Sequence, residues 1–450
     1  MAPESGAPCG SRQSSGYNWL PRIIPHAFRI ATRNALCTQW PPGMDGPQIH
    51  KEETHMLQAK RWIAFTAIAL SCTQGAQAAD PIKIGFIGSL TGPLSTLSTD
   101  MKDGFNLALK HKGGKLGGVD TVVTYGDDQA NPDTGKQVYE RMAKSENVDI
   151  ITGMAFTNVM LAVAPTAFKD KIFFVNSNAG PKELAGASCN YYYFNPTWHT
   201  SALSEAAGRF ATQKGYKRIF VIAPNYQAGR EHAEGFEKEY KGEIAGRARN
   251  KVGQLDFSVE IGQIRAAKPD AVFFALWGPM AINFVKQFNQ AGLNKKIDLV
   301  TAGFAVDADT LPALGDAAVG IYNTSQWSPD LPNAVNRKFV EDFEKEFKRP
   351  ASSYASQGYE VGLLLDAAIR DSKGKYKDDK VLHDAIMSAK YESVRSYFKF
   401  SANQNATQNI YLRQVVKNEK GQLTNKTFSS TPVYADQSDP YVGECKLAAK

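Results

Sequence analysis

The clearest hydrophobic pattern in the chain is a short apolar run, followed by a loop of small residues and then an amphipathic stretch. The run is typical of a strand buried in a parallel sheet and contains Ile82, Ile84, Phe86 and Ile87. Apolar residues then recur at helical spacing, at Met101, Phe105, Ala108 and Leu109. Because ligands of open α/β sheets bind beyond the carboxyl ends of the strands, the loop at 88–99 is where we first expect a site. An ordinary turn between strand and helix is the alternative.

The same unit recurs along the chain. Further apolar strands are predicted at 119–125, 148–152 and 172–175, and a loop follows each of them. After the first two of these loops, apolar residues recur at the spacing of a helix. After an extended aromatic piece the pattern starts again, with strands at 219–223, 271–276 and 297–301. This βαβα alternation predicts an α/β fold with parallel sheets.

Three interruptions, near 196, 328 and 396, divide the pattern. They predict two lobes, each a parallel-sheet βαβ sandwich, joined by three hinge crossovers. The first lobe would contain 79–197 and 328–395, and the second 198–327 and 396–450. The hinge would then lie behind the cleft formed by the loops, an arrangement suited to closure on a ligand.

The N-terminal residues are predicted to lie outside the fold. Lys60 and Arg61 precede an apolar run at 62–70, and Ala76-Gln77-Ala78 matches a small-x-small cleavage pattern. Residues 56–78 are therefore a predicted signal peptide, with the mature chain beginning near Ala79 and exported to the periplasm. A retained membrane anchor is the alternative, but the run is shorter than the ~18 residues that a span needs. Residues 1–55 show no periodicity, and we expect a disordered extension upstream of the true start at Met56.

The net charge and the cysteine content narrow the possible functional classes of the protein. The formal net charge is +7, and removing residues 1–78, with their seven basic and four acidic side chains, leaves 7 − 7 + 4 = +4. This mild charge, without a basic stripe, does not favour nucleic-acid binding. Beyond residue 78 the chain has two cysteines, Cys189 and Cys445. An even pair in an exported protein suggests one disulfide, and two separate buried thiols are the alternative.

Signatures of catalysis are missing from the sequence. HExxH, CxxC, GxSxG and P-loop motifs do not occur, and Gly85, Gly88 and Gly92 do not form GxGxxG. We therefore predict no enzyme activity, no metal and no cofactor. The dispersed histidines are expected at the surface, at His111, His199, His232 and His383.

Four loop segments, taken in order and spacing, resemble those of a known family. They are Ile84 to Pro93, Asp127-Asp128-Gln129 with Pro132, Gly153 with Thr157-Asn158, and Asn178 to Pro181. Over 79–450 the chain resembles the type I periplasmic solute-binding proteins of ABC transporters, of the branched-chain-amino-acid-binding type. The resemblance implies a Venus-flytrap fold that passes a small ligand to an inner-membrane permease. The protein is expected to act as a monomer.

The resemblance also implies a carboxylate site. Thr157 matches the hydroxyl residue that receives the ligand carboxylate, next to Asn158, and Asn178, Ala179 and Gly180 match the loop that completes the site. Because a helix is predicted to begin at Thr157, free N–H groups and the helix dipole would favour an anion there. A simple helix N-cap is the alternative role for Thr157.

Two positions depart from the amino-acid binders. The family's glutamate for the ammonium falls near Gly303 to Ala305, where there is no acid. Asp307 is close, but it is expected to face the second helix and not the ligand. The first-loop tyrosine is Leu97. Aromatic residues are expected to face the cleft at Phe156, Tyr226, Trp277 and Phe304, whereas Trp198 is expected to pack in the hinge or core. We therefore predict a small carboxylate ligand with an aromatic or hydrophobic body. Binding of a branched-chain or other amino acid or amide, and a sensing module for a receptor, are the alternatives.

Overall fold

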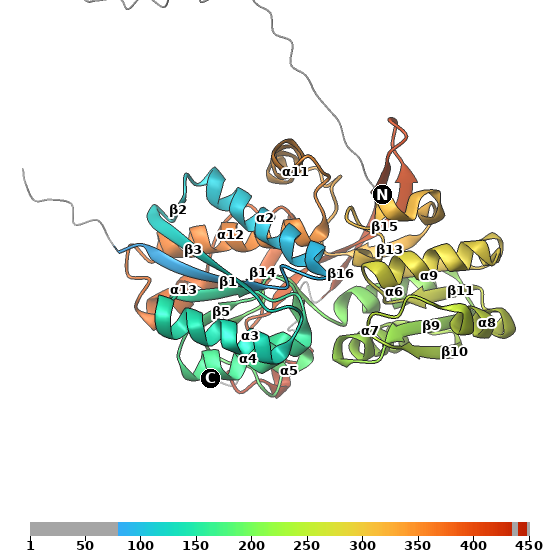
Figure 1. Cartoon of the computed structure of the whole chain (residues 1–450), viewed down its shortest axis with the longest axis horizontal. Helices are drawn as coiled ribbons and strands as arrows, with labels where there is room; N and C mark the ends of the chain where they lie inside the picture. Colours follow the sequence, from blue (N-terminus) through green and yellow to red (C-terminus); the bar gives the residue numbers. More distant parts are fainter. Residues whose placement is uncertain (1–79, 434–439, 448–450) are drawn as a thin grey trace, which may run out of the picture. The chain divides into compact units, whose positions relative to one another are not determined.

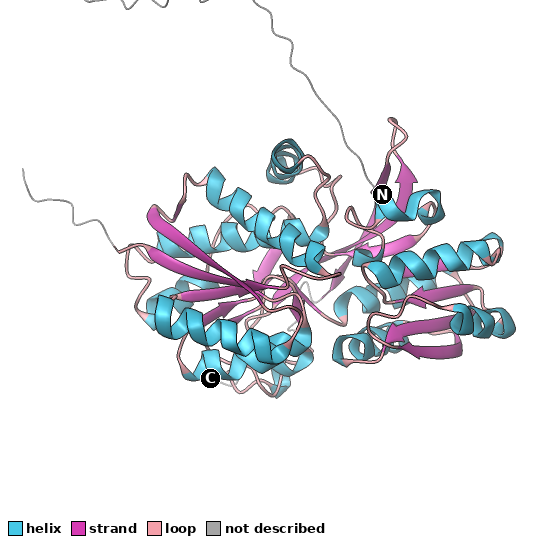
Figure 2. Ribbon diagram, in the orientation of Figure 1, coloured by secondary structure: helices cyan, strands magenta, loops and turns pink. Residues whose placement is uncertain are grey.

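The computed structural model describes residues 80–433 and 440–447. The predicted signal peptide and upstream extension lie outside these residues. The described residues fall in one compact unit, which contains two principal β-sheets, each covered by helices (Figures 1 and 2). This is the α/β architecture that the hydrophobic pattern predicts.

The first sheet has six strands in the order β2-β3-β1-β4-β5-β7. The strands are β1 (Ile82–Gly88), β2 (Lys115–Leu116), β3 (Val119–Asp127), β4 (Ile150–Gly153), β5 (Phe173–Val175) and β7 (Tyr193–Phe194). All neighbours run parallel except β2, which pairs antiparallel with β3. The apolar residues of β1 are completely buried, because helices cover both faces of a parallel sheet.

The second sheet has eight strands, in the order β10-β9-β11-β12-β13-β15-β14 with β16 also paired to β15. They are β9 (Arg218–Pro224), β10 (Glu243–Asn250), β11 (Ala271–Phe274), β12 (Asp298–Ala302), β13 (Tyr322–Ser325), β14 (Phe398–Phe400), β15 (Ala406–Lys417) and β16 (Leu423–Val433). The strands from β10 to β13 are parallel, and β14, β15 and β16 add antiparallel pairs. Successive residues of β9 pack in different clusters: Ile219 and Val221 in one, Phe220 and Ile222 in the other.

Helices connect the strands. They are α2 (Ser95–His111), α3 (Pro132–Arg141), α4 (Thr157–Lys169), α5 (Lys182–Ala185), α6 (Ala202–Lys214), α7 (Gln227–Glu239), α8 (Ser258–Ala267), α9 (Pro279–Gln290), α10 (Leu311–Leu314), α11 (Ala334–Phe347), α12 (Ser353–Asp371) and α13 (Asp379–Met387). Helices α2 and α12 lie side by side in Figure 1. A Cβ at Gly358 would lie 1.8 Å from the carbonyl oxygen of Met101, and one at Gly104 would lie 1.9 Å from that of Ala355. The two helices therefore approach closely because both positions lack a side chain.

Some elements are absent from the sequence prediction. Strand β10 has polar, half-exposed residues at the edge of its sheet, and β16 is likewise polar. Pairing with β9 and β15, and not hydrophobic alternation, makes these segments strands.

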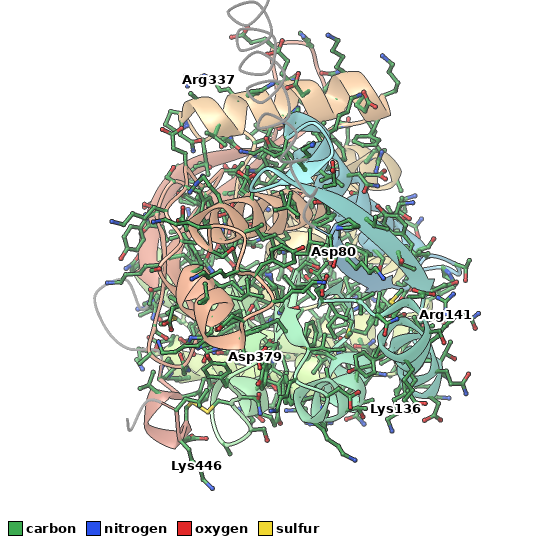
Figure 3. The ribbon with its side chains drawn as sticks, turned by 90° about the vertical axis from the view of Figure 1, so that its left-hand side faces the viewer. Asp80, Lys136, Arg141, Arg337, Asp379 and Lys446 are labelled. Carbon is green, nitrogen blue, oxygen red and sulfur yellow. A yellow bond between two sulfur atoms is a disulfide. The ribbon has the colours of Figure 1, made fainter. Side chains whose placement is uncertain are left out.

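Charged residues of α3 and α11, including Lys136, Arg141 and Arg337, point outward (Figure 3).

The ends of the two sheets are tied together near the first crossover. Asn195, after β7, forms a bridge with Asn405: its N–H donates to Gln404 O at 2.9 Å, and its carbonyl accepts from Ala406 N at 2.9 Å. Cys189 and Cys445 form a disulfide. The residue limits of the two lobes stay a prediction. None of the described helices is both long and apolar enough to cross a membrane.

Candidate ligand-binding site

A pocket lies beyond the carboxyl ends of strands from both sheets. The wall is formed by Leu97, Ala155, Phe156, Thr157, Asn178, Trp198, Tyr226, Ala228, His232, Trp277, Phe304 and Tyr354. The parallel strands end at these loops, so the topology gathers residues that are far apart in the sequence.

Most of the predicted site residues lie on this wall. The structure brings together Leu97, Phe156, Thr157, Asn178, Tyr226, Trp277 and Phe304. Asn158, Ala179 and Gly180 are not on the wall, and Asn158 is exposed. Contact of any of these residues with a ligand stays a prediction.

Thr157 is the first residue of α4, and Phe156 occupies the N-cap position without a side-chain capping bond. The Thr157 side chain is 1% exposed, and its Oγ1 is buried without a hydrogen-bond partner. The alternative role as a simple N-cap is therefore not what the structure shows. A buried hydroxyl without a partner is costly, so Thr157 is well placed to donate to a group inside the pocket. The first N–H groups of α4 add donors and a positive dipole end.

Asn178, which also lines the pocket, is held by several hydrogen bonds. Its Nδ2 donates to Ala155 O at 2.8 Å, and its backbone N–H donates to Asn176 Oδ1 at 3.1 Å. The amide of Gln357, turned so that its oxygen faces donors, donates to Asn178 Oδ1 and accepts from Trp198 Nε1, both at 2.9 Å. These bonds fix the orientation of two wall residues before any ligand binds.

Ala179 and Gly180 lie in a short strand. They form β6 (Ala179–Gly180), which pairs in parallel with β8 (Trp198–His199). A Cβ at Gly180 would lie 2.0 Å from Asn195 Nδ2 and 2.8 Å from Trp198 O, so only glycine fits. This pair of strands places the Trp198 side chain on the pocket wall.

The acidic Asp127-Asp128 segment holds the first loop. Asp127 Oδ1 accepts from Leu90 N at 2.9 Å, and Asp128 accepts from the Ser89 hydroxyl. The carboxylates therefore bind the loop that leads into α2, the helix that carries Leu97. They do not line the pocket.

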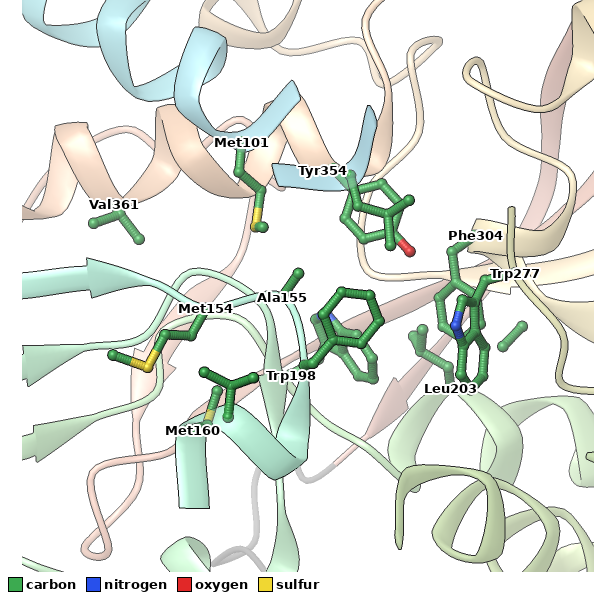
Figure 4. Packing of buried hydrophobic residues seen from close by; sticks show 14 of the residues in the cluster. Met101, Met154, Ala155, Met160, Trp198, Leu203, Trp277, Phe304, Tyr354 and Val361 are labelled. Carbon is green, nitrogen blue, oxygen red and sulfur yellow. The ribbon is translucent and has the colours of Figure 1, made fainter. Parts of the chain in front are cut away.

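Aromatic side chains form a continuous wall, part of which Figure 4 shows. Trp198 stacks on Phe304 with ring centroids 5.9 Å apart, and Trp277 contacts Phe304 edge-on at 5.8 Å. Tyr226 contacts Trp277 edge-on at 5.6 Å. Such contacts fix each ring, so the wall keeps its shape for a flat, apolar ligand.

Trp198 packs in the buried hydrophobic cluster, as expected, and it also lines the pocket. The residue follows the first crossover directly, and the pairing of β8 with β6 turns its ring toward Phe304. Tyr354, at the start of α12, was not predicted as a site residue but also lines the pocket. Asp307 faces the start of α12, and not the second helix as expected, because its Oδ2 accepts from Ser353 N at 3.0 Å.

The surface prediction is wrong for His232 and His199, which are each 2% exposed. His232 lies on α7, lines the pocket and contacts the rings of Trp198, Trp277 and Phe304. Burial lowers the pKa of His232 to about 3, so its imidazole is neutral at physiological pH. His232 lies six residues after Tyr226, in the helix that follows the loop. This spacing is the one sequence signal that could have predicted His232 as a site residue.

The pocket carries no formal charge. The described residues that line it include no Asp, Glu, Lys or Arg. Burial also raises the pKa of Tyr226 and of Tyr354 well above the ordinary value, so both hydroxyls remain protonated. The described residues contain no group of three or more His, Cys, Asp or Glu side chains placed to hold a metal ion.

Known proteins are similar to this chain in sequence and in fold. The model of the family described as "Periplasmic binding protein" matches residues 81–422. A relative from Brucella melitensis named "Leu/Ile/Val-binding protein homolog 6" is 29% identical over 387 residues, covering 84% of this chain and 98% of the relative.

Two solved structures are similar over most of the chain. The solute-binding protein of an ABC transporter from R. palustris, in complex with benzoate, is 30% identical with a TM-score of 0.75, covering 81% of this chain and 99% of that one. One from Rhodopseudomonas palustris BisB5, in complex with 3,4-dihydroxy benzoic acid, is 28% identical with a TM-score of 0.74, covering 78% and 98%. The chain therefore belongs to the periplasmic binding protein family, as a solute-binding protein of an ABC transporter.

Proposed function

We propose that this protein captures a small aromatic carboxylate in the pocket described above and delivers it to an inner-membrane permease. The observation that carries the proposal is the make-up of the wall, which combines aromatic rings with neutral hydrogen-bond donors. Flat rings suit the body of an aromatic acid, and neutral donors suit its carboxylate.

The carboxylate is assigned to the start of α4. Thr157 offers a buried hydroxyl without a partner, and the first N–H groups of the helix lie beside it. These neutral donors can stabilise a buried anion because they are already oriented and the helix dipole is positive at this end.

An α-amino acid is the second candidate, since the Brucella relative is named for leucine, isoleucine and valine. Its ammonium group needs a carboxylate or several acceptors when it is removed from water. The segment at Gly303 to Ala305 forms a short 3₁₀ turn without an acidic side chain, and the described wall has none elsewhere. The pocket therefore favours the aromatic acid. The relatives from R. palustris, in complexes with benzoate and 3,4-dihydroxy benzoic acid, support the same choice.

Calorimetric titration of the purified protein tests this proposal. Benzoate and hydroxybenzoates should bind, methyl benzoate should bind at least tenfold more weakly because it lacks the anion, and leucine should bind weakly or not at all. At a hundred times its dissociation constant, a true ligand should add about 2.7 kcal/mol to the free energy of unfolding. Leucine binding more tightly than every aromatic acid would overturn the proposal.

Export is proposed on the sequence alone. If residues 56–78 are a signal peptide, expression of the full chain should yield a periplasmic protein that begins near Ala79. N-terminal sequencing of that fraction is the test, and a start upstream of Met56 would contradict it. We further propose that the mature protein is a monomer, which light scattering after gel filtration checks.

A further inference from the structure

We propose that His232 and Ser204 form a polar subsite that reads a hydroxyl group on the ring of the ligand, so that this protein prefers a hydroxylated aromatic acid. The inference rests on the proposed function, because it concerns the far end of the same ligand. It assigns a role to a buried histidine that the carboxylate site does not use.

His232 is placed among rings on the second-sheet side of the pocket. Its ring centroid lies 5.2 Å from that of Phe304, 6.0 Å from Trp198 and 6.4 Å from Trp277. A nitrogen-bearing ring there is costly unless both nitrogens find partners.

One nitrogen is satisfied by the protein. His232 Nδ1 lies 2.8 Å from Ser204 Oγ on α6, in a buried contact between two helices. Among the hydrogen bonds of the described residues, none involves Nε2. Since His232 lines the pocket, Nε2 is the atom left for a ligand.

A neutral imidazole has one donor and one acceptor nitrogen, and burial keeps His232 neutral. If Nδ1 donates to Ser204, then Nε2 accepts from the ligand; if Ser204 donates, Nε2 donates. A hydroxyl both donates and accepts, so it completes either arrangement. An unsubstituted ring would leave Nε2 without a partner once the ligand fills the pocket, and the affinity would fall.

The ring position of the ligand hydroxyl follows from the placement of Thr157 and His232 on the two sides of the pocket. Thr157 comes from α4, which packs on the first sheet, whereas His232 comes from α7, which packs on β9 of the second. A ligand that places its carboxylate at Thr157 therefore directs the opposite part of its ring toward His232. We expect a meta or para hydroxyl, and not an ortho hydroxyl beside the carboxylate.

The test is a calorimetric comparison of benzoate with 2-, 3- and 4-hydroxybenzoate. The wild-type protein should bind the 3- or 4-hydroxy acid at least tenfold more tightly than benzoate, and the 2-hydroxy acid should show no such gain. His232→Phe keeps a ring of similar size without nitrogens, and it should reduce the ratio to within about twofold of unity. Ser204→Ala leaves the imidazole but frees Nδ1, and it should reduce the ratio partly.

His383→Phe is the matched control, because His383 stacks on Tyr191 at 4.0 Å and is not on the pocket wall. It should leave the ratio unchanged. Nitrogen-15 NMR of the wild type should show a shift of His232 Nε2 with 4-hydroxybenzoate and not with benzoate. Equal affinity of the wild type for benzoate and its hydroxylated forms, or a ratio that survives both His232→Phe and Ser204→Ala, would overturn this inference and leave the proposed function standing. If no aromatic acid binds, both fall.

Discussion

The two sides of the pocket are built from different chemistry. The first-sheet side contributes Leu97, Ala155, Phe156, Thr157 and Asn178, with a helix N-terminus and amides that are fixed by hydrogen bonds. The second-sheet side contributes Tyr226, Ala228, His232, Trp277 and Phe304, mostly rings in contact with one another. Under the proposed function, the first-sheet side binds the carboxylate common to many ligands, and the second-sheet side selects the shape of the ligand body.

The largest expected effect is on the ring side. Trp277→Ala should weaken binding of benzoate by about 3 kcal/mol, more than a hundredfold, because Trp277 is 5% exposed and contacts three other wall rings. Calorimetry measures the loss, and Trp277→Phe should recover part of it. An unchanged affinity in Trp277→Ala would remove this residue from the site.

On the polar side, Thr157→Val should cost about 2 kcal/mol of binding free energy, roughly 30-fold, because a hydrogen bond to a charged group is lost while the shape is kept. The affinity for methyl benzoate should change much less, since that ester has no carboxylate. Thr157→Ser is the control and should remain close to wild type. If Thr157→Val weakens acid and ester equally, then Thr157 does not receive the carboxylate.

A third prediction concerns the contact between the elements of the two sides. Gln227 Nε2 on α7 donates to Glu183 Oε1 of α5 at 2.7 Å and to Glu231 Oε1 at 2.6 Å. Burial, with a smaller contribution from the charge of Glu183, raises the pKa of Glu231 to about 7, although Gln227 and Lys182 oppose the shift.

The native protein therefore holds this proton more tightly than the unfolded chain does, and its stability should fall as the pH rises through about 7. Between about pH 5.5 and pH 8 we expect a loss of roughly 1 to 2 kcal/mol of unfolding free energy from this group. Urea denaturation of the wild type and Glu231→Gln measures it, since the variant should lose less stability over the same interval. Glu140→Gln, at an exposed glutamate, is the control and should follow the wild type.

The smallest effect is expected at Asn158. This residue follows Thr157 directly but is exposed and absent from the wall. Asn158→Ala should therefore change the binding free energy by less than about 0.5 kcal/mol. Calorimetry beside Thr157→Val checks the contrast between neighbours, and a tenfold loss in Asn158→Ala would mean that the ligand reaches past the first residue of α4.

Much of the site was predictable because it lies where apolar strands end. The buried strands are visible as hydrophobic runs, so the loops that carry Thr157, Asn178, Tyr226, Trp277 and Phe304 could be placed from the sequence. Two of the residues that were missed are not on such loops. His232 lies inside a helix and Tyr354 at the start of another, and neither position differs in pattern from ordinary core packing.

The sequence by itself determined the α/β class, the positions of the loops that follow the strands, and the absence of an acidic side chain from Gly303 to Ala305. These features depend on local periodicity and residue type. Only the tertiary structure decided that Trp198 turns toward the pocket, that Thr157 Oγ1 has no protein partner, and that His232 is neutral and bonded to Ser204. Those properties depend on contacts between segments far apart in the chain, and on the exclusion of water that packing brings about.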